Sequence, residues 1–253
     1  MNSESSRLDP MQSHAPVRVR GDRAAFGRPG TAPRWTPGAK DGVGTAYAAS
    51  SRLWCTLWNG IGTEVYFPTI DRPQVRDLQY LVSDGRTFFR EEKLDLVASS
   101  VERTSEHTLG YRVTTTDPEG RYAITKEIVS HPRRPCLLQR THLSGDDAWL
   151  SRLHLDALCS PRMGGAGWGD HAYVVDAAGR QMLAAEKDGV WLVMAATTPR
   201  ARLSCGYVGA SGGWTDLVDD LRMDWEFDVA RDGRGEGTWS ALAHWCSSAP
   251  LVT

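Results

Sequence analysis

Hydrophobic and polar residues alternate along much of the chain in short runs with a period of two. The clearest run covers residues 152–159, where Leu153, Leu155, Ala157 and Cys159 alternate with polar residues. Successive side chains of a strand point to opposite faces of its sheet, so this run predicts a half-buried antiparallel strand. Turn signals recur about every ten residues between such runs, which is typical of an all-β sandwich or barrel.

Three turn sequences predict hairpins between neighbouring strands. Asp84-Gly85 separates YLVS from RTFF, and Asp188-Gly189 separates MLAAEK from VWLVMAA. Such dipeptides suit the type I′ turn, because both of its central residues need positive φ. DPEG at 117–120 lies between YRVTTT and RYAITKEIV and has proline at its second position, which favours a β-turn.

Helical periodicity is rare in this sequence. The best stretch is 214–223, WTDLVDDLRM, where Leu217 and Leu221 lie four residues apart and so share one helix face. Thr215 or Asp216 is expected to cap its start. We therefore predict one or two helical turns there, within an otherwise all-β protein that has no internal repeat.

The composition is that of an ordinary globular protein with a sizeable core, with 253 residues, 41% hydrophobic and 24% charged. The formal net charge of -2 gives no basic footprint for nucleic acid. No apolar run approaches the roughly 18 residues that a membrane span needs, and the N-terminus lacks the apolar core of a secretory signal. We therefore expect no nucleic acid and no membrane as partners, and a cytoplasmic location.

The N-terminal part is interpreted as a tail followed by irregular structure. Residues 1–23 are polar, and the arginine cluster within 18–23 is expected to be solvated. Residues 26–44 are rich in glycine and proline, which disfavour regular structure. Trp35 is expected to pin this stretch to the core, because a large ring buries much apolar area.

Patterns for catalysis or metal binding are weak. The seven histidines and five cysteines are dispersed, and neither metal-ligand spacing nor a CxxC pair occurs. No GxSxG elbow is present. The glycines of GGAGWG at 164–169 lack the Lys-Ser/Thr of a phosphate loop, which favours a flexible loop carrying Trp168. We therefore predict no metal and no cofactor.

Tryptophan is abundant, with 10 residues in the chain. Exposed indole faces stack on sugar rings, so a tryptophan-rich β-sandwich favours carbohydrate as a partner. We expect about two-thirds of the tryptophans in the core and the rest at loops or an interface. Trp168, in a glycine-rich loop, and Trp214, after Ser-Gly-Gly, are the candidates for exposed contact with sugar.

A series of collinear motifs resembles a known family. The motifs are the segment around Trp35, KDGVGTA (40–46), TEVYFPTIDRPQ (63–74), RDLQ (76–79), DGRTFFREE (84–92), LGYRV (109–113), TDPEGRY (116–122), GWG (167–169), SCGYVGASGGWTDL (204–217) and RMDWEFD (222–228). They run from about residue 24 to 230. Together they strongly resemble the N-terminal domain of bacterial glucoamylases and glucodextranases of glycoside hydrolase family 15.

The resemblance implies a supersandwich, in which two large antiparallel sheets pack face to face as in galactose-mutarotase-like proteins. In the full-length family a linker leads on to an (α/α)6 barrel whose two glutamates perform inverting hydrolysis of α-glucans or dextran. Nothing in this chain resembles that barrel, so no catalytic residue is carried over. The implied function is a carbohydrate-associated accessory domain of an α-glucan exo-hydrolase. Its implied partners are an α-glucan or oligosaccharide and the barrel.

The last residues do not continue the family pattern. VARDGRGEGTWSALAHWCSSAPLVT, at 229–253, alternates poorly and ends in small residues. We therefore divide the chain into a polar tail (1–23), the sandwich domain (24–230) and a C-terminal tail (231–253). We interpret the change near residue 230 as a truncation or a reading-frame shift.

The polar-aromatic loop YFPTIDRP at 66–73 is the candidate site. Its prolines fix φ and stiffen the loop. If such sandwich loops lean on the barrel beside the sugar site, as the resemblance suggests, then Tyr66, Asp71 and Arg72 contact the barrel or the glucan. The alternative is that Asp71 and Arg72 only cap and brace the turn.

Two further functions stay open. One is a stand-alone carbohydrate-binding or truncated interaction module without hydrolase activity. The other is an enzyme of mutarotase type, which needs a His/Glu pair on a sheet face. His154, on the polar face of its strand, is the evident candidate for such a pair. Glucose release from maltooligosaccharides and anomer exchange followed by polarimetry separate these functions.

Overall fold

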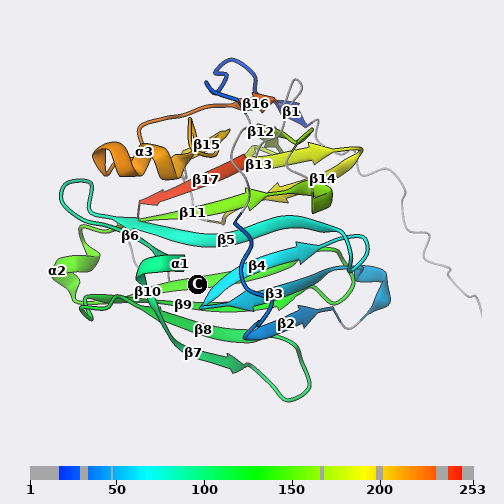
Figure 1. Ribbon diagram of the computed structural model, residues 1–253, viewed down its shortest axis with the longest axis horizontal. Helices are drawn as coiled ribbons and strands as arrows, with labels where there is room; N and C mark the ends of the chain where they lie inside the picture. Colours follow the sequence, from blue (N-terminus) through cyan, green and yellow to red (C-terminus); the bar gives the residue numbers. More distant parts are fainter. Residues whose placement is uncertain are drawn as a thin grey trace, which may run out of the picture.

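The chain folds into three antiparallel sheets joined by short helices (Figure 1). The computed structural model describes residues 17–28, 34–46, 48–165, 168–197, 202–231 and 239–246, with the backbone alone at 98–99 and 239–246. The prediction of a large all-β sandwich with few helical turns is confirmed.

The largest sheet has eight strands. In spatial order they are β15 (Arg202–Tyr207), β17 (Trp239–Cys246), β11 (His154–Pro161), β5 (Pro73–Ser83), β4 (Ile61–Tyr66), β3 (Trp54–Trp58) and β2 (Gly42–Thr45), with β6 (Phe89–Glu91) paired to β5. Its centre is formed by β5 and β11, which pair over almost their whole length.

The two smaller sheets have five and four strands. The five-stranded sheet holds β1 (Arg18–Val19), β12 (His171–Ala177), β13 (Arg180–Lys187), β14 (Val190–Met194) and β16 (Val229–Arg231). The four-stranded sheet holds β10 (Leu137–Gly145), β9 (Tyr122–Ser130), β8 (Tyr111–Thr116) and β7 (Val97–Arg103). The helical elements are η1 (Ala49–Ser51), α1 (Glu92–Asp95), α2 (Asp147–Leu150), η2 (Met163–Gly165) and α3 (Gly213–Asp220).

Both smaller sheets cover the same face of the eight-stranded sheet. Through its pairing with β17, Leu203 lies in one register row with Ala157 and Tyr80, and partners in a row point to the same face. Leu203 packs in a cluster with residues of β12 and β13. Ala157 and Tyr80 pack against β9. The two smaller sheets therefore form the second layer of the sandwich together.

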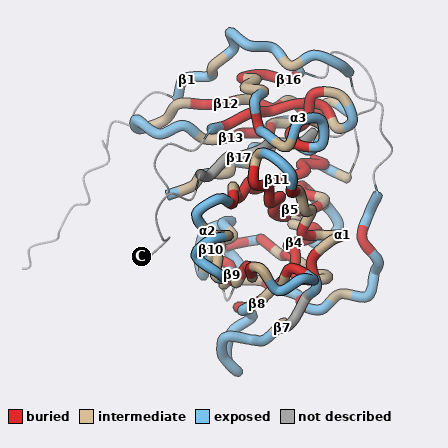
Figure 2. Tube along the Cα trace, turned by 90° about the vertical axis from the view of Figure 1, so that its left-hand side faces the viewer, coloured by how far each residue is buried: buried red, intermediate tan, exposed pale blue. Residues whose placement is uncertain are grey.

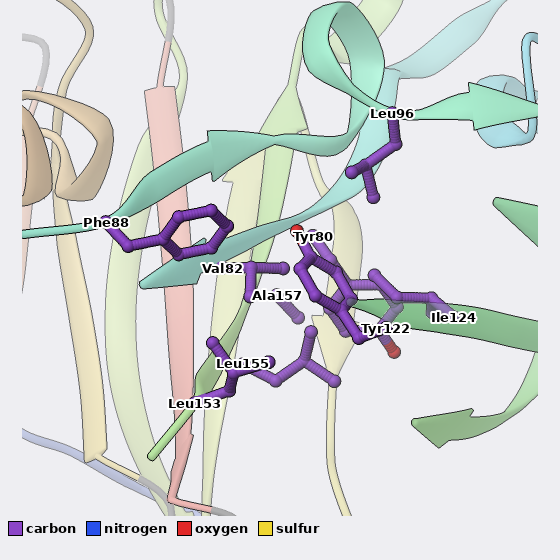
Figure 3. Packing of buried hydrophobic residues seen from close by; sticks show 9 residues of the cluster. All are labelled: Tyr80, Val82, Phe88, Leu96, Tyr122, Ile124, Leu153, Leu155 and Ala157. Carbon is purple, nitrogen blue, oxygen red and sulfur yellow. The ribbon is translucent and has the colours of Figure 1, made fainter. Parts of the chain in front are cut away.

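The core between the eight-stranded and four-stranded sheets is a continuous apolar cluster. Figure 3 shows Tyr80 and Val82 of β5 with Leu155 of β11, facing Tyr122 and Ile124 of β9. Tyr122 and Ile124 are 1% and 0% exposed, and the buried segments gather where the layers meet (Figure 2). Burial of such side chains is worth about 1.5–3 kcal/mol each relative to exposure, so this interface stabilises the domain strongly.

The outer face of the eight-stranded sheet is also covered. Leu81 and Leu158 point away from the second layer and pack against Leu217 of α3 and Met223. Asp156 on this face is likewise 0% exposed. The prediction that 152–159 is half-buried is therefore wrong. The strand β11 lies at the centre of the sheet with α3 behind it, which the alternation of residue types does not reveal.

A buried ion pair lies inside the sandwich. Lys126 of β9 points inward and donates a hydrogen bond to Glu92, the first residue of α1. Glu92 also accepts from the Tyr80 backbone amide at 2.9 Å and from the Thr115 hydroxyl at 2.7 Å. The two side chains are 1% and 0% exposed. A buried carboxylate needs such partners, because an unpaired charge in the interior is very costly.

Two of the three predicted hairpin turns are confirmed. Asp188 and Gly189 have φ of 50° and 78°, as a type I′ turn requires, and join β13 to β14. Residues 117–120 join β8 to β9. The two-residue turn at Asp84-Gly85 is wrong, because pairing resumes only at Phe89 opposite Ser83.

The longer loop after β5 has a local cause. The Asp84 carboxylate accepts hydrogen bonds from the backbone amides of Arg86, Thr87 and Phe88 at 2.8–3.0 Å. Asp side chains compete in this way with ladder hydrogen bonds. The side chain of Asp84 therefore closes a loop where the dipeptide pattern alone favoured a tight turn.

The predicted helix at 214–223 is confirmed as α3, but its predicted cap is wrong. Gly212 occupies the N-cap position of α3, and Leu221, at the C-cap position, has φ of 69°. Asp216 is 3% exposed and accepts a hydrogen bond from the Trp225 amide at 2.8 Å. The carboxylate that was expected to cap the helix instead fixes the segment that follows it.

The arginine cluster near the N-terminus is attached to the fold. Strand β1 pairs with β12, and Arg20 donates to Asp176 at 2.8 Å. Arg23 donates to Asp228 at 3.0 and 3.1 Å. The interpretation as a free tail is therefore wrong for Arg20 and Arg23, although their side chains remain 39% and 45% exposed, as a solvated cluster requires. Residues 1–16 of the predicted tail lie outside the described residues.

The C-terminal part contributes a strand to the large sheet. Within 231–253, the described residues 239–246 form β17, which pairs with both β11 and β15. The poor alternation of this stretch gave no sign of a strand. Its place between two other strands explains why, because a central strand does not need to alternate hydrophobic with polar residues.

Candidate functional site

The predicted site loop connects β4 to β5 at one end of the sandwich. The Phe67 amide donates to the Arg72 carbonyl at 3.1 Å, and the Arg72 amide donates to the Thr69 carbonyl at 3.1 Å. The Phe67–Pro68 peptide bond is cis. The Gln74 side-chain amide donates to the Phe67 carbonyl at 2.5 Å. These contacts hold the loop as a closed unit, as its prolines predict.

The loop places its polar residues and one aliphatic residue in solvent. Asp71 and Arg72 are exposed, Tyr66 is partly buried, and Ile70 is 65% exposed. Burial and the nearby Glu64 carboxylate raise the pKa of Tyr66. A hydrogen bond from the Thr69 hydroxyl lowers the pKa of Asp71. Asp71 thus braces its own turn and still faces outward.

The helix η2 lies directly against this loop. The Gln74 side-chain oxygen accepts from the Gly164 amide at 3.1 Å, and the Gln74 carbonyl accepts from the Arg162 amide at 2.9 Å. Gly165 has φ of +76°, and a side chain there would meet Pro73 at 3.4 Å. Gln74 therefore links the predicted site loop to the segment that leads to Trp168.

Trp35 joins the same end of the molecule through a cation–π contact. The Arg162 guanidinium carbon lies 5.7 Å from the centre of the Trp35 ring. The ring is 40% exposed, so the prediction that it is pinned in the core is wrong. The anchor is the next residue, Thr36, whose buried hydroxyl donates to Glu64 at 3.0 Å. Lys40 also binds Glu64.

Trp168 is held in a similar way by a lysine. The Lys187 ammonium lies 5.6 Å from the centre of the Trp168 ring and donates to the Trp168 carbonyl. It also lies 3.5 Å from a carboxylate oxygen of Asp170. Trp168 is 54% exposed, whereas Asp170 is 0% exposed. The ring therefore faces solvent above a buried ion pair.

Asp170 has an unusual pKa for an aspartate. Its other carboxylate oxygen accepts from the Met163 amide at 3.4 Å. Burial raises its pKa to about 7, and this effect exceeds the opposing attraction of Lys187. Perturbed carboxyls mark candidate functional sites. Because Asp170 is covered by its neighbours, its effect on a ligand would act through Lys187 and Trp168.

We name this region the loop end and define it by Trp35, Tyr66–Arg72, Arg162, Trp168, Asp170 and Lys187. It combines exposed aromatic rings with fixed cations and hydrogen-bonding groups. Such surfaces suit contact with a sugar or with another protein domain, since one side is apolar and the other polar. The structure brings four of the five predicted site residues to this end.

Trp214, the fifth predicted site residue, lies elsewhere. It is at the start of α3, is 41% exposed, and donates to the Glu91 carboxylate at 3.0 Å. Glu91 pairs with Leu81, eight residues along β5 from Pro73. At about 3.3 Å per residue, that separation is about 26 Å. Trp214 and the loop end therefore do not form one small site.

Tryptophan is used mainly near the surface. Among the tryptophans whose side chains are described, none is buried: Trp35, Trp54, Trp58, Trp149, Trp168, Trp191, Trp214 and Trp225. The expectation that about two-thirds lie in the core is wrong for these residues, because Tyr, Leu, Ile and Val fill the core. Four of these rings are exposed and available for contacts outside the domain: Trp35, Trp168, Trp191 and Trp214.

The loop end contains residues that the sequence did not point to. No sequence motif includes Arg162, Asp170 or Lys187. They come together only because the ends of three separate strands lie side by side in the fold. Within the part of the chain that the structure describes, no cluster of three or more His, Cys, Asp or Glu side chains could hold a metal ion. No described helix has the length and apolar character that crossing a membrane requires.

Comparison with known proteins gives a consistent result. Residues 25–237 match the family model described as glucodextranase, domain N. A glucoamylase of Clostridium sp. (strain G0005) is 33% identical over 214 residues, which cover 85% of this chain and 30% of that protein. The crystal structure of a bacterial glucoamylase complexed with acarbose superposes with a TM-score of 0.83 at 29% identity, covering 90% of this chain and 33% of that one.

The chain therefore spans about a third of the length of the glucoamylases that it matches. The match covers most of this chain and includes the whole loop end. Fold, collinear motifs and identity agree, so the chain belongs to the glucodextranase N-terminal domain family.

Proposed function

We propose that this chain acts as the accessory N-terminal domain of a glucoamylase-type α-glucan hydrolase and has no hydrolytic activity of its own. The observation that carries the proposal is the coverage of the relatives. Almost the whole chain matches about a third of each glucoamylase, and the matching family is defined as a separate N-terminal domain.

The chemistry of the loop end supports a non-catalytic role. An inverting glycosidase needs two carboxyl groups about 6.5–9.5 Å apart on either side of the sugar. At the loop end, Asp71 is exposed, but Asp170 is 0% exposed beneath Lys187. A carboxyl group without access to substrate does not protonate a glycosidic oxygen.

The loop end is the surface that we propose to contact an (α/α)6 catalytic domain and its α-glucan. Ile70 at the loop tip is 65% exposed, and Tyr66, Asp71 and Arg72 surround it with polar groups. An exposed aliphatic residue with polar neighbours in the same loop suits contact with another domain. The backbone hydrogen bonds of the loop keep the entropy lost on docking small.

The second candidate function is a carbohydrate-binding module that acts alone. It is favoured by the exposed Trp168 ring, which Lys187 holds in place. The glucoamylase of similar structure was crystallised with acarbose, an observation about that protein. In this function Trp168 stacks on a glucose unit of an α-glucan, and Trp214 forms a separate contact.

Two measurements on the purified chain test both functions. Glucose release from maltooligosaccharides should be absent, and release at the rate of a full-length glucoamylase would reject the proposal. Calorimetric titration with maltoheptaose then separates the two functions. If the wild-type chain binds maltoheptaose and Trp168→Ala abolishes that binding, the carbohydrate-binding module is supported. The matched control is Trp191→Ala, because Trp191 is 55% exposed and, paired with Glu186, points to the face of the sheet opposite to Lys187.

A further inference from the structure

A cavity of about 770 Å³ lies at the end of the sandwich opposite to the loop end. Four segments line it: the turn after β5, the residues leading into β11, the start of β15, and the segment that follows α3. In Figure 1 this is the left end, where α3 and α2 lie. The volume is within the range of about 300–1,000 Å³ that is usual for small-molecule sites.

The lining of this cavity is strongly basic. Its charged residues are Arg86, Arg152, Arg202 and Arg222, with Asp84 and Asp224 as the carboxylates, and His154 lies beside them. Among the lining residues, four arginines against two aspartates leave a surplus of two positive charges without counting the histidine, and Glu226 lies beside Arg202. The whole chain has a net charge of -2, so the surplus is local. A concave basic surface raises the local concentration of anions.

The Asp84 carboxylate forms an ion pair with one arginine of the cavity. This carboxylate accepts three backbone amides of its own turn and a hydrogen bond from Arg152 at 2.8 Å. These donors hold the pKa of Asp84 well below its usual range. Its side chain is 1% exposed. Asp84 therefore fixes the turn and Arg152, and is itself covered.

Two further arginines are positioned by backbone carbonyl groups. Arg222 donates from Nε to the Gly85 carbonyl at 3.1 Å, and Arg202 donates from Nη1 to the Met223 carbonyl at 3.3 Å. Arg202 also lies 3.6 Å from Glu226, and 53% of its side chain is exposed. A guanidinium has five N–H donors, so each of these arginines keeps donors for a ligand after its positioning contacts.

We propose that this cavity binds a small ligand that carries a phosphate group. Several planar guanidinium groups around one cavity match the oxygens of a phosphate, which they can bind in pairs. A phosphate offers these separate guanidinium groups more oxygen acceptors than a single carboxylate does. The volume leaves room for an organic group beside the phosphate, so a phosphorylated sugar fits as well as free phosphate. The proposal is independent of the accessory function.

Calorimetric titration of the full chain at low salt tests this site with three probes: glucose 6-phosphate, inorganic phosphate and glucose. Both phosphates should bind and glucose should not. Tighter binding of glucose 6-phosphate identifies a phosphorylated sugar as the ligand class, and equal affinity identifies free phosphate. The double variant Arg202→Gln and Arg222→Gln should weaken binding by about tenfold or more, because charge-assisted hydrogen bonds are lost.

The matched control is the double variant Arg112→Gln and Arg140→Gln. It removes the same charge from the outer face of the four-stranded sheet, where both arginines contact Glu127. If the pocket variant does not fold, Arg86→Gln tests the same cavity with a single exposed side chain. Failure of the wild-type chain to bind either phosphate overturns the proposal. So does an equal loss of binding in the control variant.

Discussion

The two ends of the sandwich present different chemistry on one scaffold. At the loop end, aromatic rings lie over single cations, and a hydrogen-bonded loop projects Ile70 into solvent. At the other end, four arginines surround a cavity. The loop end has the mixture of apolar and polar groups that suits docking to a domain or a sugar. The cavity end has the charge that suits an anion. One domain can thus separate two kinds of contact by placing them at opposite ends of its strands.

The two ends are joined by one buried interior. The largest predicted loss of stability comes from removing one partner of the ion pair inside it. Lys126→Met leaves Glu92 as an uncompensated buried charge between the sheets. We expect a loss of about 3–5 kcal/mol in the free energy of unfolding, measured by urea denaturation. The double variant Lys126→Met and Glu92→Gln should recover much of this loss. A single variant as stable as wild type would contradict the assigned burial of the pair.

The next prediction concerns the pH dependence of stability, which two buried aspartates should control. Burial raises the pKa of Asp170 at the loop end to about 7, and that of Asp216 in α3 to about 6. The folded state then binds more protons than the unfolded state between about pH 4 and the folded pKa, so stability falls as the pH rises through that window. Asp170→Asn removes this fall, because the amide does not ionise.

Measured against wild type, Asp170→Asn should therefore gain relative stability from pH 5 to pH 8. One pKa unit corresponds to about 1.4 kcal/mol, so the gain should amount to a few kcal/mol at most. Asp216→Asn should show the same sign with a smaller change, since its folded pKa is lower. Denaturation curves at several pH values measure both. A relative loss of stability at high pH in Asp170→Asn would contradict the assigned direction.

The smallest predicted effect on stability is at the loop tip. Ile70 is 65% exposed, so Ile70→Asp should change the free energy of unfolding by no more than about 0.5 kcal/mol. Leu138→Asp, at a position 47% exposed on the four-stranded sheet, is a matched control. Thermal denaturation of the isolated chain measures both. A large loss at Ile70 alone would show that the loop tip supports the fold rather than a partner.

The sequence predicted the two ends unequally, for a physical reason. The loop at 66–73 is continuous, and its prolines and polar residues are visible as one motif. The cavity end gathers arginines from positions 86, 152, 202 and 222, which only strand pairing brings together. Local patterns report on neighbours in the chain and carry no information about such assemblies.

The same reason explains which predictions about the fold were wrong. The hairpin at Asp188-Gly189 was predictable because the turn geometry depends on those two residues alone. The burial of Leu158 in β11 depends on α3, which comes from a distant part of the chain. The contact of Trp35 with Arg162 likewise joins residues that are far apart in sequence. Tertiary contacts therefore decided each case that the sequence pattern missed.

A chimeric glucoamylase tests the accessory role most directly. Residues 17–246 of this chain, which include β17, would replace the corresponding domain of the Clostridium glucoamylase, and glucose release from maltooligosaccharides would be measured. We predict that Ile70→Asp with Arg72→Gln at the loop end lowers the rate of glucose release, whereas Arg202→Gln with Arg222→Gln leaves it unchanged. A chimera that keeps full activity with the loop-end variant but loses it with the cavity variant would contradict a docking role for the loop end.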